Sequence, residues 1–459
     1  MNIRIAFFLI FLANILNAQI ELEHFSTWSD SNLVASNAHD NTYNEIWGHS
    51  LNGREYAIIG STEGTHFIDV TDPRNPVEVE RVIGGTVGAS IIHRDYHNLG
   101  NYLYGVADEG SRSTLQIMDM SYLPDSVSLV YDSRELIRRS HNIFIDTTNL
   151  LLYSLISGNS TSGFTPMAIF DISDPVNPVE VGRYSSIDGF SISQVHDAYI
   201  VDNLAFLNCG PSGFAIADFT DPLDPSILSA FRVDDYPQGG YNHSGWANED
   251  LTHYYLADEN HGFDMKVIDV TDPREARFLS TFNAESESPF SIPHNQIVKG
   301  DYLYVSYYFD GVQVFDISNP AEPIRSHFYP TSTFPHTNGL YRGAWGVYPF
   351  LPSGNLIASD MQNGLFVLSG VEQTTSINEV EEEKLVISPN PSQGIIDLGS
   401  HGEVGQTYSI YGLNGQLLDR GSIEVGHKIY LPETLENATY ILNLISEEGV
   451  LSTKIILSK

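Results

Sequence analysis

The stretch that decides the fold is Phe67-Ile68-Asp69-Val70-Thr71-Asp72-Pro73. It joins β-branched and aromatic residues, which favour strands, to an Asp-Pro turn, which ends a strand. The same phrase returns along the chain, and each leading aspartate lies 47 to 52 residues after the previous one. These aspartates are Asp69, Asp119, Asp171, Asp218, Asp269 and Asp316. A seventh, degenerate copy lies at residues 364–368.

The segments between the copies contain short runs of strand-forming residues, such as Tyr102-Leu103-Tyr104-Gly105-Val106, and turn residues bound each run. A period near 50 residues with about four short strands per unit is typical of a β-propeller blade. We therefore predict an all-β chain with a seven-bladed β-propeller over residues 19–370. The repeated aspartates are interpreted as turn formers before calcium ligands, because Asp beside Ser or Pro bonds the nearby backbone.

Both ends of the chain differ from the repeats. Residues 1–18 predict a secretory signal peptide: Arg4 is followed by an apolar run too short to span a bilayer, and Asn17-Ala18 offers a cleavage site. Residues 371–383 are rich in Thr, Ser, Asn and Glu and predict an acidic linker. Residues 384–459 return to short alternating strands and predict a small β-sandwich.

The charge balance limits the partners of the protein. The 459 residues carry 58 acidic and 22 basic side chains, for a net charge of -36. Such acidity argues against nucleic acid and anionic membranes, and it favours a monomer. No later stretch is apolar enough to predict a transmembrane segment. Cys209 is the sole cysteine, so no disulfide forms within the chain, and its strand-like surroundings predict a buried, unreactive thiol.

Stretches between residues 44 and 370 resemble the choice-of-anchor B family of LVIVD-repeat propellers. The stretches that carry this resemblance are Ile46-Trp47-Gly48, Gly64-Thr65-His66-Phe67-Ile68-Asp69-Val70, Ser140-His141-Asn142, His243-Ser244-Gly245-Trp246 and Gly343-Ala344-Trp345-Gly346-Val347-Tyr348-Pro349-Phe350. The resemblance implies an extracellular propeller and brings no settled activity with it.

The last 75 or so residues resemble the C-terminal sorting domain of type IX secretion substrates. The resemblance rests on Ser388-Pro389-Asn390-Pro391, Tyr411-Gly412-Leu413-Asn414-Gly415 and Thr453-Lys454-Ile455-Ile456. Ala438 departs from the pattern, which usually has Gly two residues before the late Tyr440. The resemblance implies that residues 384–459 engage the type IX secretion machinery and that the protein reaches the outer-membrane surface or the medium.

A second recurring position, here called the anchor, precedes each copy of the repeat, and in most copies it is a histidine. The anchors are His49, His97, His141, His196, His243, His294 and, in the seventh copy, Trp345. Equivalent positions in a ring form a circle around its axis, so inward-pointing imidazoles would gather at one channel mouth. Imidazole binds transition metals, and the many carboxylates would suit calcium. The metal-ligand candidates are His97, His141, His196, His243 and His294.

Two stretches of the chain that depart from the repeat pattern suggest ligand binding. Residues 242–250 and 257–262 are richer in polar groups than the other copies. The ligand-binding candidates are His243, Trp246, Asp258, Glu259, His294 and Trp345. A structural interpretation stands beside this one, because each histidine has Asp or Asn close by and the pair could close a turn within its blade. Asp258-Glu259 could likewise be a solvated turn.

The sequence contains no catalytic motif for a serine hydrolase, a zinc protease or a phosphate-binding loop. The leading hypothesis is therefore a surface or secreted binding module that takes a glycan or a protein at the channel mouth. The alternative is a metal-dependent extracellular hydrolase or lyase, and a third possibility is a purely structural scaffold. The enzyme requires three histidine nitrogens that converge on one point, about 2.0–2.1 Å away for zinc.

Overall fold

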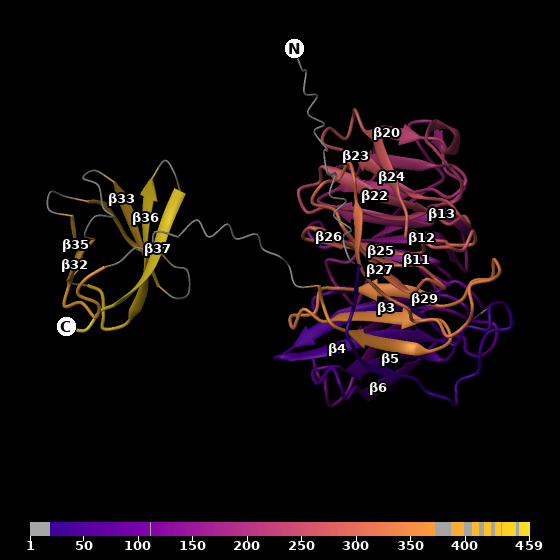
Figure 1. Cartoon of the computed structure of the whole chain (residues 1–459), viewed down its shortest axis with the longest axis horizontal. Helices are drawn as coiled ribbons and strands as arrows, with labels where there is room; N and C mark the ends of the chain where they lie inside the picture. Colours follow the sequence, from indigo (N-terminus) through magenta and orange to yellow (C-terminus); the bar gives the residue numbers. More distant parts are fainter. Residues whose placement is uncertain are drawn as a thin grey trace, which may run out of the picture. The chain divides into compact units, whose positions relative to one another are not determined.

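The computed structural model describes residues 19–110, 112–371, 387–398, 406–412, 417–423, 427–432, 434–446 and 449–459. The predicted signal peptide and, apart from Val371, the predicted acidic linker lie outside these residues. The chain divides into two compact units, Met1–Gln373 and Thr374–Lys459 (Figure 1). Each unit is described by itself below.

The described part of the first unit contains seven sheets of four or five strands and one short ribbon. The first four sheets comprise β3 (Tyr43–Leu51), β4 (Arg54–Ser61), β5 (Gly64–Asp69) and β6 (Val77–Ile83); β7 (Arg94–Leu99), β8 (Tyr102–Ala107), β9 (Leu115–Asp119) and β10 (Ser128–Ser133); β11 (Asn142–Asp146), β12 (Leu151–Asn159), β13 (Gly163–Asp171) and β14 (Val179–Tyr184); and β17 (Asp197–Val201), β18 (Leu204–Asn208), β19 (Phe214–Asp218) and β20 (Ser226–Phe231). The ribbon pairs β15 (Ser186–Ile187) with β16 (Phe190–Ser191).

The other three sheets include the first strands of the described chain. They comprise β21 (Asn242–Ala247), β22 (His253–Asp258), β23 (Met265–Asp269) and β24 (Arg277–Phe282); β25 (Gln296–Lys299), β26 (Tyr302–Ser306), β27 (Val312–Asp316), β28 (Ile324–Tyr329) and β1 (Ile20–Glu21); and β29 (Ala344–Tyr348), β30 (Leu356–Asp360), β31 (Gly364–Leu368) and β2 (His24–Trp28). The described residues contain one helical turn, η1 (Val233–Asp235). All pairings within these sheets are antiparallel except that of β1 with β28.

One edge strand of each sheet lies beside the corresponding strand of the next sheet. These seven strands, here called the first strands, are β3, β7, β11, β17, β21, β25 and β29. β3 neighbours β7, β7 neighbours β11, and the series continues through β17, β21 and β25 to β29, which in turn neighbours β3. The sheets therefore follow one another around a common axis, as the blades of a β-propeller do. Seven first strands face that axis, and they carry the candidate site.

The two ends of the first unit are joined through its sheets. β2 pairs with β31, with Thr27 opposite Phe366, so the first strands of the chain complete the sheet that holds the last strands. β1 runs parallel to β28, with Ile20 opposite His327. This pairing covers strand edges that would otherwise be exposed and holds the arrangement closed.

Hydrogen bonds explain the repeated aspartates. Each leading aspartate accepts a hydrogen bond from the backbone N–H two residues later, at 2.8 to 3.1 Å. Asp69 also pairs with Arg54 at 2.6 Å. The turn-forming interpretation is thus confirmed for all six copies. A β-bulge accompanies the third and fourth strands of each of these sheets, for example between Phe67 and Ile68.

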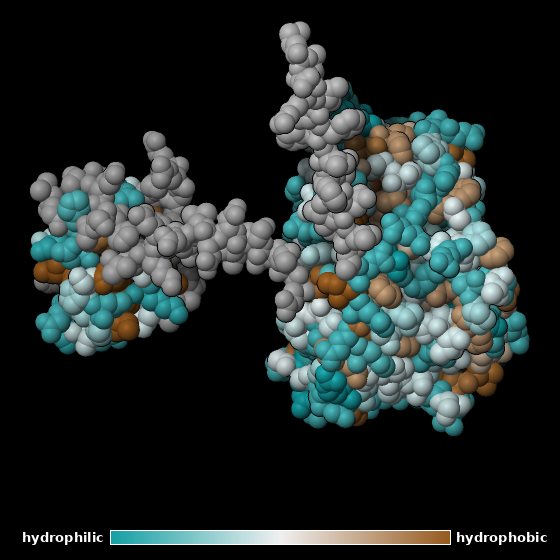
Figure 2. Space-filling model, in the orientation of Figure 1, coloured by the Kyte–Doolittle hydropathy of each residue, from teal (hydrophilic) through white to brown (hydrophobic). Residues whose placement is uncertain are grey.

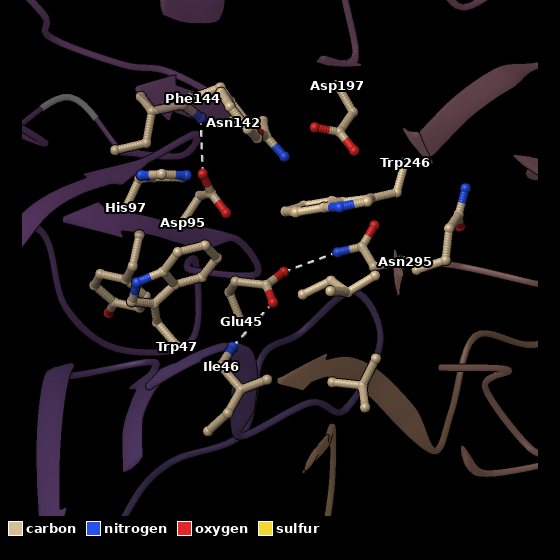
Figure 3. A pocket seen from close by; sticks show the side chains of 15 residues that line it. Glu45, Ile46, Trp47, Asp95, His97, Asn142, Phe144, Asp197, Trp246 and Asn295 are labelled. Carbon is tan, nitrogen blue, oxygen red and sulfur yellow. Dashed lines mark hydrogen bonds between the residues drawn. The ribbon is translucent and has the colours of Figure 1, made fainter. Parts of the chain in front are cut away.

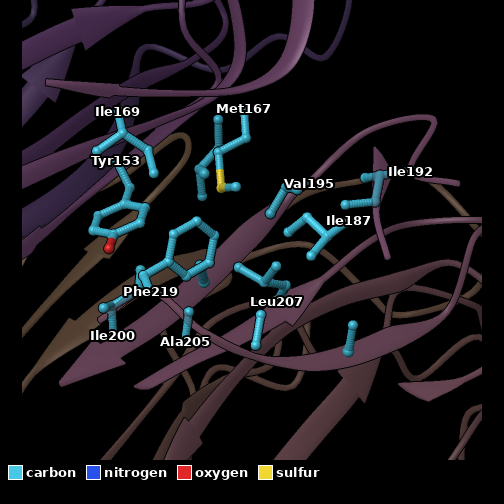
Figure 4. Packing of buried hydrophobic residues seen from close by; sticks show 14 of the residues in the cluster. Tyr153, Met167, Ile169, Ile187, Ile192, Val195, Ile200, Ala205, Leu207 and Phe219 are labelled. Carbon is cyan, nitrogen blue, oxygen red and sulfur yellow. The ribbon is translucent and has the colours of Figure 1, made fainter. Parts of the chain in front are cut away.

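The core lies between neighbouring sheets. Figure 4 shows one cluster in which Tyr153, Met167 and Ile169 of the third sheet pack toward Leu207 and Phe219 of the fourth sheet and its following turn. Each of these side chains is almost fully buried, and burial of one large apolar side chain contributes about 1.5–3 kcal/mol. Cys209 lies in the same cluster, and burial raises the pKa of its thiol, as expected for an unreactive cysteine.

The second unit contains two sheets. One is four-stranded, with β34 (Leu417–Ser422), β33 (Thr407–Gly412), β36 (Thr439–Ser446) and β37 (Gly449–Ile456); the other pairs β32 (Ile395–Asp397) with β35 (Lys428–Tyr430). Their buried side chains form one cluster, to which Ile396 and Ile429 contribute from the small sheet and Ile410 and Leu442 from the large one. The unit is therefore all-β, like the first.

The surface is mixed in polarity. The face shown in Figure 2 carries isolated hydrophobic residues among hydrophilic ones. The structure describes no helix with the length and apolar character needed to cross a bilayer.

Candidate functional site

Six aromatic rings form a closed circle at one end of the axis. Neighbouring ring centroids lie 4.0 to 5.3 Å apart all the way round. The members of this histidine ring are His93, His141, His196, His243, His294 and Trp345. Each lies in, or just before, the first strand of a different sheet. The remaining sheet, which begins with β3, places Glu45 beside the ring.

Bulges aim several of these side chains at the axis. The pairing of β21 with β22 shifts between Asn242 and Ser244, and this shift places His243 in the irregular step. Similar shifts surround Trp345 in β29 and Glu45 in β3. A bulge rotates a side chain out of the regular alternation of a strand, and bulges are frequent beside functional sites.

Hydrogen bonds fix the tautomers of three histidines of the ring. Nδ1 of His196 donates to the carbonyl oxygen of His243 at 3.2 Å, and Nδ1 of His294 donates to the carbonyl oxygen of Trp345. Nδ1 of His141 donates to Asp108 Oδ2 at 3.0 Å. A histidine that donates through Nδ1 presents the lone pair of Nε2 as a ligand, and metal-binding histidines are commonly held in this way.

Burial keeps most of the ring uncharged. Desolvation, with repulsion from neighbouring histidines, holds the pKa of His196 and His243 well below its usual value. Desolvation also lowers the pKa of His294 to about 3. His141 differs: burial opposes its charge, but the hydrogen bond to Asp108 and the nearby carboxylates together outweigh burial and raise its pKa. Neutral imidazoles at neutral pH are available as metal ligands without losing a proton.

Two groups that combine ring histidines with a neighbouring carboxylate have the spacing of metal ligands. One consists of His93, Asp108 and His141, and the other of His243, Glu259 and His294; within each group the ligand atoms all lie within 4.8 Å of one another. In the first group, Asp108 already pairs with His141 and with Arg139 at 2.5 Å. In the second group the ligand atoms are less engaged with one another, since Glu259 Oε2 lies 3.8 Å from His243 Nε2, beyond hydrogen-bond distance.

The second group is also held in place by its neighbours. Tyr308 donates a hydrogen bond from its hydroxyl to Glu259 Oε1 at 2.6 Å, which leaves Oε2 directed at His243. Desolvation raises the pKa of Glu259 to about 7. Two imidazole nitrogens and one carboxylate are ligands of zinc and of iron(II) in proteins, whereas calcium prefers oxygen alone. This geometry suits a divalent transition metal.

Three carboxylates lie further along the same strands. Glu45, Asp95 and Asp197, here called the acidic layer, face one another across the axis in Figure 3. Desolvation raises the pKa of Glu45 to about 8 and that of Asp197 to about 7, and it raises the pKa of Asp95 well above its usual value. The recorded ion pairs of the described residues include none to these three groups.

Aromatic side chains follow the acidic layer. Trp47 lies 4.5 Å from His97, and His97 lies 4.7 Å from Phe144, centroid to centroid. Trp246 completes the arc, 5.9 Å from Phe144. These rings and the acidic layer line a cavity of about 50 Å³, here called the lower cavity, to which all seven first strands contribute residues.

The metal candidates predicted from the sequence divide into two sets. The structure brings His141, His196, His243 and His294 together in the ring. It places His97 in the aromatic arc instead, and His93 takes the ring position that the prediction gave to His97. His49, the first anchor, is buried with no ring contact to the histidines of the axis.

The predicted ligand-binding residues also divide. His243, Glu259, His294 and Trp345 lie at the ring, and Trp246 lines the lower cavity. Asp258 does not face the axis, because it forms a fully buried ion pair with Lys266 at 2.6 Å and accepts a hydrogen bond from Tyr236 at 3.1 Å. Its surroundings mark it as a structural residue of the fifth sheet, and neither the ligand-binding interpretation nor the solvated turn describes it.

Three residues of the axis were missed in the sequence: His93, Asp108 and Glu45. A signal existed for two of them, since Glu45 precedes His93 by 48 residues and His93 precedes His141 by 48, close to the repeat period. Asp108 follows the end of β8, and the sequence carries no signal that would bring it to His141.

Comparison with known proteins agrees with the fold. Residues 165–186 and 295–331 match the LVIVD repeat family. A solved structure, the β-propeller domain of Cps50 (Swd1) from Myceliophteria thermophila, is similar with a TM-score of 0.52 and 11% sequence identity, over 75% of this chain and 99% of that one. The chain is an LVIVD-repeat β-propeller. A search of the curated proteins finds no match to this LVIVD-repeat propeller.

Proposed function

We propose that this protein is an extracellular binding module that holds its ligand at the histidine ring of a closed, seven-bladed propeller. The observation that carries the proposal is the ring itself, in which buried, neutral imidazoles are tied outward through Nδ1 at His196 and His294. A ring that served only to close turns would satisfy both nitrogens within its own blade. Instead, these donors reach the next blade, and the lone pairs remain at the axis.

The same proposal assigns a divalent transition metal to His243, Glu259 and His294. Their ligand atoms lie close together, and Tyr308 and the carbonyl oxygen of Trp345 hold two of the three in place. Such a metal keeps coordination positions free, and a glycan hydroxyl or a protein side chain can complete its sphere. The binding partner is therefore a glycan or a protein that offers a ligand atom to this metal.

The export route is part of the proposal. Residues 1–18 have the charge and apolar run of a signal peptide, residues 384–459 resemble a type IX sorting domain, and the all-β second unit is compatible with that resemblance. These features support secretion to the medium or attachment at the outer-membrane surface. Mass spectrometry of the exported protein should show an N-terminus at Gln19; a retained Met1 would contradict the signal-peptide assignment.

Metal content tests the binding site. The full chain, purified without a His tag or chelator and dialysed with zinc, should retain about one metal ion per chain by elemental analysis. His243→Ala with His294→Ala should lose it. His253→Ala, on β22 and hydrogen-bonded to Thr252, is the matched control and should keep it. Equal metal in the double variant and the control would overturn the assignment.

A metal-dependent extracellular hydrolase or lyase is the second candidate. Among the described residues no close ligand group has the three histidines expected for the enzyme, but the set of two histidines and one carboxylate favours it in another form, because such a set leaves room for a metal-bound water, the nucleophile of many hydrolases. The zinc-loaded protein would then cleave a polysaccharide or peptide substrate. Activity that disappears in Glu259→Gln while the metal remains bound would favour the enzyme. Ligand retention on a glycan array without cleavage would favour the binding module.

A further inference from the structure

The lower cavity has a chemistry of its own. It lies on the axis beyond the histidine ring and is lined by the acidic layer on one side and by Trp47, His97, Phe144 and Trp246 on the other. Figure 3 shows Glu45, Asp95 and Asp197 directed into this space, with the indole of Trp246 alongside. The geometry points to a binding site for an organic cation, namely the ammonium or guanidinium end of a ligand.

The hydrogen bonds recorded among the described residues give the three carboxylates neutral donors, and Asp197 accepts one from the N–H of Ala198 at 2.8 Å. Glu45 accepts hydrogen bonds from Asn295 Nδ2 at 2.8 Å and from the backbone N–H of Ile46 at 3.0 Å. Asp95 accepts one from the N–H of Ile143 at 2.7 Å. Buried carboxylates are ordinarily paired with a cation or a metal, because an isolated buried charge is costly. The raised pKa values keep protons on these carboxyl groups in the empty site, and a positive guest would displace the protons and pair with the carboxylates.

The protein's own cations do not supply that charge. Arg94 is adjacent to Asp95 in sequence, but its guanidinium donates to the carbonyl oxygens of Ser61 and Thr86 at 2.7 and 2.8 Å. His97 lines the cavity and is buried, and its Nδ1 has no hydrogen-bond partner within the described residues. Desolvation lowers the pKa of His97 to about 4, so this ring is neutral at neutral pH. Two features, the uncompensated carboxylates and the unpartnered imidazole, therefore mark one cavity.

The aromatic walls select the kind of cation. The face of an indole or phenyl ring attracts ammonium and guanidinium groups, with Trp the strongest partner. Trp47 is fixed in orientation, because its Nε1 donates to Asn98 Oδ1 at 2.7 Å. A bare calcium ion would need six or more oxygens at about 2.3–2.6 Å, and the acidic layer does not form one of the close ligand groups found among the described residues. An organic cation bonds carboxylates at longer range and also contacts the rings.

The size of the cavity limits the guest to an end group. About 50 Å³ accommodates a charged terminus, not a whole metabolite. Trp47 and Trp246 are only half-buried, so the rest of a ligand can extend past them toward the face opposite the histidine ring. The net charge of -36 raises the local concentration of cations around the molecule. This site does not depend on the metal proposed at the ring.

Calorimetric titration of the full chain tests the inference. Propylammonium and methylguanidinium chloride are the probes, and 1-butanol is the neutral, similarly shaped control. At least one cation should bind with a stoichiometry near one, and butanol should not. Glu45→Gln with Asp197→Asn should weaken binding by about tenfold or more, and Trp246→Leu by several fold. Asp69→Asn, which alters a paired carboxylate outside the channel, should change affinity less than about twofold.

Several outcomes would overturn the inference. These are the absence of binding by both cations at tens of millimolar, unchanged affinity in the double variant, and saturation by calcium or potassium that the organic cations do not displace. Thermal shift of wild-type protein gives a second measurement that does not need the variants to fold. The cations should raise the melting temperature, and butanol should not. Stabilisation by butanol alone would contradict a charged guest.

Discussion

Glu45 should make the empty propeller less stable as the pH rises, and Glu45→Gln should remove this effect. The folded-state pKa of Glu45 is about 8, raised from 4.5 by burial and by the nearby Asp197. A carboxyl group with a raised folded pKa contributes stability that is fully present below the unfolded pKa of about 4.5. That stability is lost as the pH rises through about 8. Asp95, Asp197 and the ring histidines face Glu45 and remain in the variant.

The magnitude follows from the shift. Each pKa unit corresponds to about 1.4 kcal/mol, so the rise from 4.5 to about 8 corresponds to about 5 kcal/mol above pH 8. For a unit of about 350 residues, an unfolding entropy of ~2.1 cal/mol/K per residue gives about 0.7 kcal/mol per degree. Between pH 5 and pH 9 about 4 kcal/mol of this stability is lost, so the melting temperature of the wild type should fall about 5–6 °C further than that of Glu45→Gln.

Differential scanning calorimetry across this pH range measures the effect. Glu78→Gln is the matched control of opposite sign, because hydrogen bonds from His66 and Arg81 outweigh burial and hold the pKa of Glu78 at about 2. Its loss should destabilise the protein above pH 4.5. Parallel pH profiles for the wild type and Glu45→Gln would refute the reasoning, since they would mean that Glu45 is ionised and solvated in the folded protein.

The remaining predictions concern the fold. Lys266→Met should lower the unfolding free energy, measured by chemical denaturation, by about 3–5 kcal/mol, because it leaves Asp258 buried without its cation. A second change, Asp258→Leu, should restore part of that free energy. Cys209 should react with a thiol reagent only after unfolding, and modification of the native protein at the same rate would contradict its burial. Removal of residues 19–28 should lower the melting temperature markedly, because β1 and β2 complete two sheets; an unchanged melting temperature would argue against closure by these strands.

The sequence predicted the repeated part of the fold well. The period near 50 and the Asp-Pro turns follow from local chemistry: in every copy the leading aspartate bonds the backbone two residues later, as at Asp69 and Asp316. Such a bond involves only neighbouring residues, so it can be predicted from the sequence. The side chains of each first strand that face the axis cannot be predicted in this way, because a bulge such as the one at His243 changes which residues point to the axis.

The histidine ring shows where this limit lies. His93 and His97 both precede a copy of the repeat and both lie near the axis, but only His93, which is partly exposed, joins the ring. The prediction chose His97, which lies four residues after His93, within β7, and belongs to the aromatic arc. A strict use of the period would have chosen His93, which lies 48 residues before His141. Contacts across sheets, such as that of Asp108 with His141, depend on ring closure and have no local signature.

The contrast between turns and axis is itself an argument for function. At the repeated turns the carboxylates are hydrogen-bonded within their own blade, and several are also paired, as Asp69 is with Arg54. At the axis Asp95 is buried and Glu45 and Asp197 are partly buried, without a cation among the described residues, and the raised pKa values of all three reflect the cost of charging them there. A large core offsets that cost, and binding of a positive guest would recover it. The same axis therefore offers neutral nitrogens for a metal at the ring and carboxyl oxygens for an organic cation beyond it, and the two sites can be distinguished by what each one binds.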